Sequence, residues 1–301
     1  MKLLKLAALL LLPLLAACAA SIAPPHSVGT PAFHSDRVTI TASGSGPDVI
    51  LIPGLSSSTA VWDSTVAALP GYRYHLVQVN GFAGAPVQGN AEGPVVAPVA
   101  EEIARYIDAQ GLDRPALVGH SLGGTLAMMV AARHPDAASK VMVVDMVPFL
   151  GALFLPGATP ESVEPLAAQM RAGIADPDNP PAQREATARQ TIATMIRTQS
   201  LRAGPIEDTL ASDPAVSGQA MYDLITTDLR PELAAIDIPV SVLWVNAPNS
   251  PISEEQMAQF YRSSFANAPQ VVITHVPDSY HFIMFDAPER FWAELDSFLR
   301  E

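Results

Sequence analysis

The stretch Gly119-His120-Ser121-Leu122-Gly123-Gly124 decides the fold of this chain. It joins an apolar run, Ala116 to His120, to an apolar segment that we expect to be helical. A serine with glycines two residues before and two residues after it, at a strand-to-helix junction, is the nucleophile-elbow pattern. The turn is so sharp that the serine needs strained backbone angles and its flanking glycines must lack a Cβ. The pattern predicts a hydroxyl at the end of a strand, facing free N–H groups of the next helix.

Apolar runs typical of strands alternate with segments of helical periodicity on both sides of this elbow. The alternation predicts a mostly parallel, doubly wound α/β sheet, because helices that connect parallel strands cover both faces of the sheet. The expected strands span residues 37–42, 48–52, 72–79, 115–120, 140–147, 238–245 and 271–276.

The alternation stops between residues 148 and 237, where no strand is indicated. Thr159-Pro160 and Asp213-Pro214 are typical helix starts, each an N-cap followed by proline at the first helical position. We therefore expect a core formed by residues 37–147 and 238–301, with 148–237 inserted as a helical cap. Methionines at helical spacing are more typical of a cap interior than of a substrate pocket, and this applies to Met170, Met195 and Met221.

From about Val38 to the C-terminus, the chain resembles the α/β-hydrolase fold serine hydrolases. Besides the elbow, the segment Asp278-Ser279-Tyr280-His281-Phe282 lies just before the last expected helix, where the family carries its catalytic histidine. The resemblance implies an α/β-hydrolase fold with Ser121 as nucleophile and His281 as general base. A serine hydroxyl needs such a base because it is a weak nucleophile at neutral pH.

The resemblance also implies an oxyanion hole made of backbone N–H groups. The family's short glycine motif after an early strand corresponds here to Pro53-Gly54-Leu55, with proline in place of the usual histidine. Leu55 N–H and Leu122 N–H are the expected donors. Candidates for the substrate pocket are Phe82, His120, Phe149 and Phe154. Phe82 is equally compatible with capping the core, and His120 is expected to pack against the sheet rather than to act in catalysis.

The catalytic acid departs from the family's usual pattern. The family commonly places an aspartate after the strand that corresponds to residues 238–245, but Asn246 to Ile252 contains no carboxylate. Glu254 and Glu255 follow, where acidic residues are expected simply to offset a helix dipole. Asp145 ends the strand after the elbow strand and keeps the chain order serine, acid, histidine. We predict Asp145 as the acid, with a strand-end carboxylate that caps backbone N–H groups as the alternative.

The implied reaction is acyl transfer to Ser121 followed by hydrolysis, without a metal or an organic cofactor. Carboxylic esters of small molecules, with short acyl chains, are the expected substrates. Lactonase, thioesterase or C–C bond hydrolase chemistry stays open because the fold hosts many reactions. A catalytically silent envelope-binding protein is the alternative from a different class.

The N-terminus reads as an export signal. Residues 1–17 contain two lysines followed by a leucine-rich core, and Leu15-Ala16-Ala17-Cys18 resembles a bacterial lipobox. The resemblance implies lipidation of Cys18, the chain's only cysteine, with residues 18–36 as a tether. The predicted location is the bacterial cell envelope, lipid-anchored; a plain secretory signal and a soluble exported protein are the alternative.

The charge balance narrows the classes of partner. The sequence has 17 basic and 30 acidic residues, a formal charge of −13, without a basic cluster. This balance argues against nucleic acid or anionic lipid as the main partner, so a membrane contact would depend on the lipid anchor. The sequence does not indicate an oligomeric state.

Overall fold

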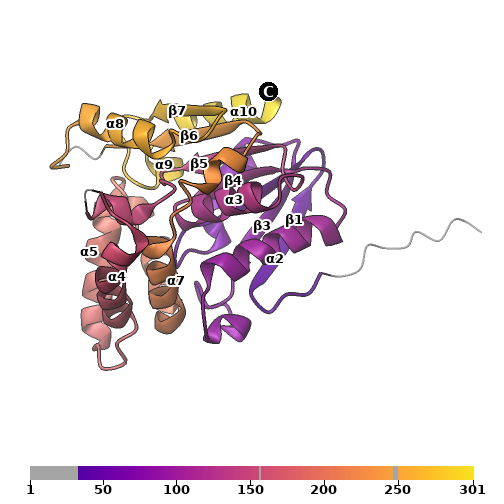
Figure 1. Ribbon diagram of the computed structural model, residues 1–301. Coiled ribbons are helices and arrows are strands. Elements are labelled where there is room, and N and C mark those ends of the chain that lie inside the picture. The colour runs from indigo at the N-terminus through magenta and orange to yellow at the C-terminus, as the bar shows by residue number, and fades with distance from the viewer. Residues whose placement is uncertain (1–32, 156, 247–249) are drawn as a thin grey trace, which may run out of the picture. The chain divides into compact units, whose positions relative to one another are not determined.

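The computed structural model describes residues 33–155, 157–246 and 250–301, all within one compact unit of the chain. A seven-stranded sheet runs through it in the order β1-β3-β2-β4-β5-β6-β7 (Figure 1). Only β1 is antiparallel to its neighbour, so the predicted mostly parallel, doubly wound α/β sheet is confirmed. The strands are β1 Val38–Gly44, β2 Asp48–Ile52, β3 Arg73–Val79, β4 Ala116–His120, β5 Lys140–Val144, β6 Val240–Trp244 and β7 Val271–His275.

Two apolar clusters cover the two faces of the sheet. Successive residues of β2 alternate between them, since Ile50 and Ile52 belong to one cluster and Val49 and Leu51 to the other. This follows from the two-residue period of a strand. The first cluster includes side chains of α2 Val96–Ala109, α3 Leu122–Arg133 and α8 Glu254–Ser264; the second includes those of α10 Pro288–Arg300, next to α1 Asp63–Ala68 and α9 Ile283–Asp286.

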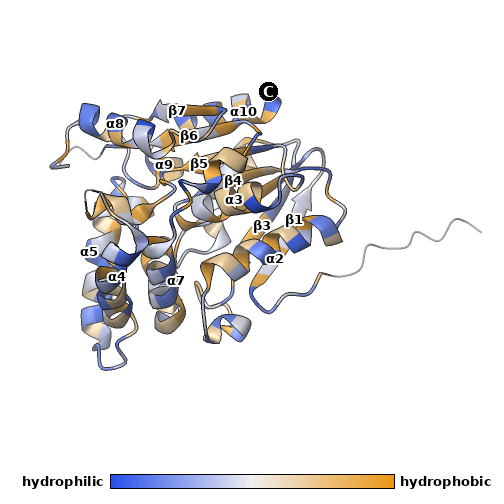
Figure 2. Cartoon of the chain, in the orientation of Figure 1, coloured by the Kyte–Doolittle hydropathy of each residue, from blue (hydrophilic) through white to orange (hydrophobic). Residues whose placement is uncertain are grey.

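Helix α3, directly after the elbow, is apolar on nearly all sides, as a central helix covered by neighbours requires. Its residues from Leu122 to Ala131 are all buried. Figure 2 shows this helix in hydrophobic colours along most of its length, whereas α2 and α5 mix hydrophobic and hydrophilic residues. The elbow is therefore held by the most deeply buried helix of the fold.

The segment between β5 and β6 forms helices, and the residues described there contain no strand. They are α4 Pro160–Ile174, α5 Pro181–Met195, α6 Ala203–Ala211 and α7 Pro214–Thr226. Proline is the first residue of α4 and of α7, and the side chains of Thr159 and Asp213 cap these helices. Helix α4 packs on α7 (Figure 1), and α5 packs on α6.

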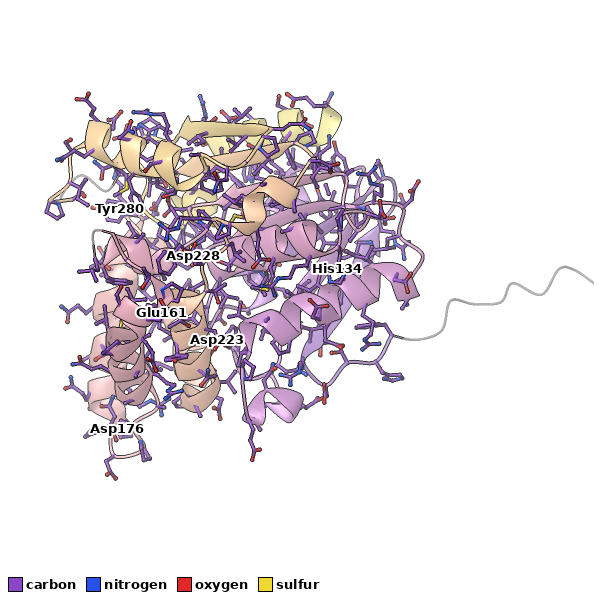
Figure 3. The ribbon with its side chains drawn as sticks, viewed as in Figure 1. His134, Glu161, Asp176, Asp223, Asp228 and Tyr280 are labelled. Carbon is purple, nitrogen blue, oxygen red and sulfur yellow. The ribbon has the colours of Figure 1, made fainter. Side chains whose placement is uncertain are left out.

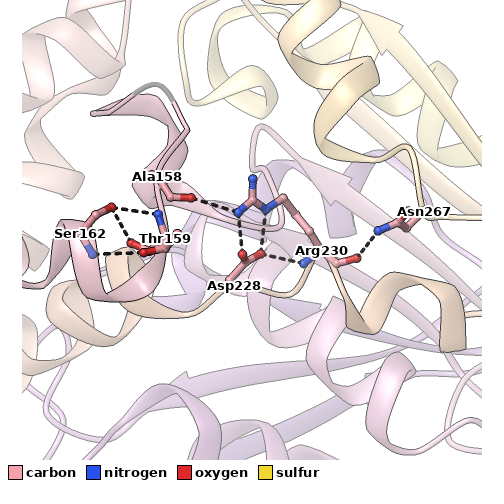
Figure 4. Close-up of polar contacts among 6 residues, drawn as sticks. All are labelled: Ala158, Thr159, Ser162, Asp228, Arg230 and Asn267. Atoms are coloured by element: carbon pink, nitrogen blue, oxygen red, sulfur yellow. Dashed lines mark hydrogen bonds and ion pairs between the residues drawn. The ribbon is translucent and has the colours of Figure 1, made fainter.

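Arg230 connects the two ends of this helical segment (Figure 4). Its guanidinium forms an ion pair with Asp228 at 2.6 Å, donates to Ala158 O at 3.3 Å and lies over the Phe149 ring. Its own carbonyl accepts a hydrogen bond of 2.9 Å from Asn267 Nδ2. Arg230 thus joins the beginning and the end of the insertion through its side chain, and it reaches the core through its backbone carbonyl.

The packed unit starts before the predicted boundary at residue 37. Phe33 packs edge-on against Tyr106, with ring centroids 5.0 Å apart, and Ser35 Oγ accepts hydrogen bonds from Arg37 N and Val38 N. The predicted signal, residues 1–17, and Cys18 lie outside the described residues. None of the described helices has the length and hydropathy to cross a membrane.

Candidate active site

Ser121 lies in the sharp turn between β4 and α3. Its backbone φ of 54° and ψ of −122° are in a region that L residues rarely adopt. A Cβ at Gly119 would overlap the carbonyl oxygen of Gly123, and a Cβ at Gly123 would overlap that of Ile52. The two glycines are therefore required by contacts with backbone, as the pattern predicts.

His281 and Asp145 meet across 136 residues of sequence. His281 lies in the loop between β7 and α9, and its Nδ1 is 2.7 Å from Asp145 Oδ2. This pairing makes Nδ1–H the donor to the carboxylate and leaves Nε2 for the cavity that both residues line together with Ser121. No hydrogen bond joins Ser121 Oγ to His281 among the described residues, and such contacts commonly tighten only when substrate is bound.

The other oxygen of the carboxylate is also satisfied. Asp145 Oδ1 accepts hydrogen bonds from the Tyr261 hydroxyl at 3.0 Å and from Val245 N at 3.2 Å. Burial, together with the charge of Asp145, raises the pKa of Tyr261 well above its usual range, so the phenol keeps the proton that it donates. The predicted strand 140–147 ends at Val144, because Asp145 turns out of it with a φ of 52°.

Tyr261 was not predicted from the sequence. It comes from α8, 116 residues after Asp145, and no local motif marks it. The only signal is its place on the buried side of a helix that is otherwise largely polar.

His120 packs beneath the catalytic candidates. Its side chain is 1% exposed; Nε2 lies 3.1 Å from the His281 carbonyl oxygen, and its ring centroid is 4.6 Å from the rings of both His281 and Phe282. Burial, with a smaller effect of nearby His281, lowers the pKa of His120 well below its usual range. A neutral ring donates through Nε2–H, which supports the loop that carries His281.

The predicted oxyanion donors follow two adjacent parallel strands, β2 and β4. Gly54 packs so closely on the elbow that a Cβ there would lie 3.1 Å from Ser121 Cβ. Leu55 is the next residue and lines the cavity, and Leu122 is the first residue of α3, where backbone N–H groups have no partner within the helix.

A cavity of about 690 Å³ extends from these residues between the core and the inserted helices. Of the predicted pocket residues, His120 and Phe154 line it. The predictions for Phe82 and Phe149 are wrong. Phe82 is 0% exposed in the cluster that contains α2 and α3, and Phe149 is 1% exposed beneath Arg230, because both aromatic rings turn inward from loops that follow strands.

The methionines also depart from expectation. Met170, Met195 and Met221 all line the cavity, although each also packs against a neighbouring apolar cluster. Flexible thioether side chains can do both, because they adapt to irregular apolar surfaces.

The inserted helices hold the loop after β2 through polar contacts that the sequence does not indicate. Ser56 Oγ lies 2.8 Å from Ser217 Oγ of α7, and Ser58 donates to Asp208 of α6 through both its backbone N–H and its hydroxyl. Ser56 has a φ of 55°, so its backbone is strained. The hydrogen bonds from the inserted helices hold the segment that contains Leu55 in this conformation.

Within the described residues, no group of three His, Cys, Asp or Glu side chains is arranged to hold a metal ion. The chemistry that the site offers on its own is nucleophilic and acid–base, with a serine, a histidine and a carboxylate in one cavity.

Comparison with known proteins identifies the family. A sequence model described as alpha/beta hydrolase fold matches residues 47–288. The chain belongs to the α/β-hydrolase fold family.

Figure 3 shows that Tyr280, beside the family's histidine position, and Asp176, in the loop between α4 and α5, lie near opposite ends of the inserted helices.

Two curated α/β hydrolases of similar sequence carry the same name, pimeloyl-[acyl-carrier protein] methyl ester esterase. The protein from Aeromonas hydrophila is 30% identical over 67% of this chain and 77% of its own length. The protein from Vibrio atlanticus is 31% identical over 70% of this chain and 80% of its own length.

Solved structures agree on the fold of this α/β hydrolase. The enol-lactonase from Burkholderia xenovorans LB400 matches with a TM-score of 0.70 and 19% identity, covering 88% of this chain and 96% of that one. An esterase from Thermogutta terrifontis matches with a TM-score of 0.71 and 18% identity, covering 87% and 93%. At these identities the likeness concerns the fold alone.

Proposed function

We propose that the protein hydrolyses carboxylic esters of small molecules through an acyl-enzyme on Ser121. The single observation that carries the proposal is the 2.7 Å contact between His281 Nδ1 and Asp145 Oδ2, in the cavity that Ser121 lines. The names of the curated relatives, which are methyl ester esterases, support the same class of reaction.

The reaction takes place in two steps. Ser121 Oγ attacks the ester carbonyl carbon while His281 Nε2 accepts its proton, and Leu55 N–H and Leu122 N–H stabilise the negative oxygen. The C–O bond then breaks, and His281 returns the proton to the departing alcohol. Water attacks the acyl-enzyme by the same route, releasing the acid and restoring Ser121.

Asp145 holds His281 in the tautomer with the proton on Nδ1 and stabilises the imidazolium that forms during both steps. Tyr261 and Val245 N fix the carboxylate, because they occupy its second oxygen. Asp145 is thus oriented from two elements, α8 and the end of β6.

The test combines a covalent probe with a panel of esters. A fluorophosphonate probe should label Ser121, and p-nitrophenyl esters of short acyl chains should be hydrolysed, with both signals lost in Ser121→Ala. Folded protein that is neither labelled nor active would instead favour the silent binding protein. A preference for long-chain emulsified lipids would contradict the expectation of small substrates in a cavity covered by helices.

We also propose that the enzyme is exported and anchored in the bacterial cell envelope by a lipid on Cys18. The lipobox-like segment before Cys18 supports this location. Fourteen residues of sequence lie between Cys18 and Phe33, the first residue that the structure describes, and they fall in the stretch 18–36 predicted as a tether.

A further inference from the structure

One charged side chain in the cavity has no role in the proposed hydrolysis. Among the described residues that line the cavity, Arg184 is the only lysine or arginine, and Asp145, the only acidic residue, is already paired with His281. Most of the lining is apolar, including Leu150, Ile192 and the three methionines.

Arg184 lies on the face of α5 that borders the cavity. Its companions on this face follow the helical period and are Thr187, Ala188, Thr191, Ile192 and Met195. At the other end of the helix, Met195 O accepts a hydrogen bond of 3.2 Å from Phe282 N, the residue after His281. Met195 is eleven positions after Arg184, which corresponds to about 16 Å along the helix.

The direction of α5 also places Arg184, near its start, away from the catalytic candidates. Helix α5 begins after the loop that contains Asp176, at the end of the inserted helices away from Tyr280 (Figure 3). Arg184 therefore lies toward the far end of the cavity, and the catalytic candidates lie at the near end.

Arg184 is half-buried, and within the described part of the chain no carboxylate forms an ion pair with it. Its neighbour Glu185 is paired with Arg189 instead, at 2.7 Å. Among the polar residues that line the cavity, Thr187 lies one turn after Arg184 on α5, and Asn179 shortly precedes that helix. A guanidinium partly removed from water and left without an anion is suited to receive a planar oxyanion, to which it can donate two parallel hydrogen bonds.

We propose that the cavity takes a linear ester with an anionic group at its far end, a carboxylate or a phosphate, which Arg184 binds while the ester carbonyl lies at Ser121. The inference rests on the proposed function and specifies its substrate class. The apolar wall between the two ends, rich in methionine, fits the connecting alkyl chain.

The test compares matched pairs of substrates. Monomethyl esters of linear dicarboxylic acids, from succinic to dodecanedioic acid, are assayed against methyl esters of monocarboxylic acids with the same chain lengths. We expect kcat/KM to favour the charged substrates at one intermediate length. Arg184→Met should reduce that preference about tenfold to a hundredfold, because a hydrogen-bonded charge pair is lost.

Three further comparisons isolate the role of the charge. Arg184→Lys should retain part of the preference, and Arg189→Met should leave it unchanged, because Arg189 is exposed, paired with Glu185 and outside the cavity lining. A methyl ester with a terminal phosphate in place of the carboxylate decides between the two anions. An equal effect of Arg184→Met on charged and neutral substrates would overturn the proposal.

A binding experiment tests this inference independently of the proposed hydrolysis. Calorimetry on Ser121→Ala should show tighter binding of the half-ester than of its neutral match, and Arg184→Met in the same background should abolish the difference. If the wild-type enzyme hydrolyses no ester, the proposed function fails, yet this binding comparison still decides whether Arg184 receives an anion. Equal binding of both compounds would refute the anion site.

Discussion

The carboxylate of Asp208 accepts two hydrogen bonds from Ser58, at 2.8 Å from the backbone nitrogen and at 2.7 Å from the hydroxyl. Asp208 belongs to α6 in the insertion, whereas Ser58 follows the loop after β2 that contains Leu55. This contact ties the inserted helices to the segment from which an oxyanion donor is proposed. Stability of the insertion and activity of the core should therefore be coupled.

Asp208→Asn should lower both the stability of the protein and its catalytic activity. Loss of hydrogen bonds to a charged acceptor is expected to lower the free energy of unfolding by about 1.5–3 kcal/mol. It should also lower kcat more than it raises KM, since the proposed donor acts on the transition state. Urea denaturation and ester kinetics measure the two effects, with Glu207→Gln, an exposed neighbour, as the matched control. A change in stability without any change in kcat would limit Asp208 to a structural role.

Asp145→Asn should keep the fold and lower kcat by roughly 10³ to 10⁴, because the amide favours the wrong tautomer of His281. Asparagine also tolerates the left-handed backbone at this position, where φ is 52°. Steady-state kinetics with a p-nitrophenyl ester and circular dichroism measure the two properties.

Glu254→Gln and Glu255→Gln are the matched controls for that variant. Both residues lie in the first turn of α8, and Glu254 Oε1 is 3.2 Å from His275. They should retain near-normal turnover. The reverse result, an active Asp145→Asn with an inactive glutamate variant, would show that Asp145 is not the acid.

Gly123→Ala should strongly destabilise the enzyme. The added Cβ would overlap the carbonyl oxygen of Ile52 at the end of β2, and backbone cannot yield as a flexible side chain does. Overpacking of this kind costs about 1–3 kcal/mol or more, which denaturant unfolding would detect. Gly204→Ala is the control, because beyond its chain neighbours and the backbone of its own helix no described heavy atom lies within 4 Å of its Cβ position. Equal stability of both variants would mean that the elbow is less tightly packed than described.

His120 should make stability depend on pH. Its pKa in the folded protein is lowered by burial, so the unfolded chain binds the proton more readily. The contribution of neutral His120 is therefore fully present above about pH 6.5, the ordinary pKa, and is lost as the pH falls below it, at up to about 1.4 kcal/mol per pH unit. Urea unfolding of His120→Asn between neutral and mildly acidic pH should show a smaller loss. An unchanged slope would argue against a buried neutral ring.

Cys18→Ala should release the enzyme from membranes. A precursor that depends on lipidation would no longer be processed before residue 18, and the protein should move from the membrane fraction to the soluble or unprocessed fraction. Fractionation with mass spectrometry of the mature N-terminus measures both. Unchanged processing and fractionation would point to an ordinary secretory signal instead.

Local patterns were sufficient to predict the sheet, the elbow and the loop with His281. Strand runs and the glycines around Ser121 report on contacts a few residues away, so one sequence contains the information. Asp145 was predicted because the family's usual position offers no carboxylate, and because Asp145 ends the strand after the elbow strand and keeps the chain order serine, acid, histidine.

Residues contributed by distant elements were not predictable in the same way. Tyr261, Asp208 and Arg184 come from helices whose faces are set only by packing in three dimensions. Phe82 and Phe149 were misplaced for a related reason. An aromatic residue in a loop after a strand can turn toward the core or toward the ligand, and the local sequence is the same in both cases.

The left-handed backbone of Ser56, Ser121 and Asp145 bears on how this enzyme responds to selection. Each such residue costs on the order of 1–3 kcal/mol, and glycine would relieve that cost at all three positions. Glycine at Ser56 or Asp145 would also remove side-chain hydrogen bonds, which offsets the gain. Directed evolution for heat resistance alone should therefore enrich glycine at Ser121 and yield stable but inactive proteins. Only a screen that also demands turnover would preserve the serine.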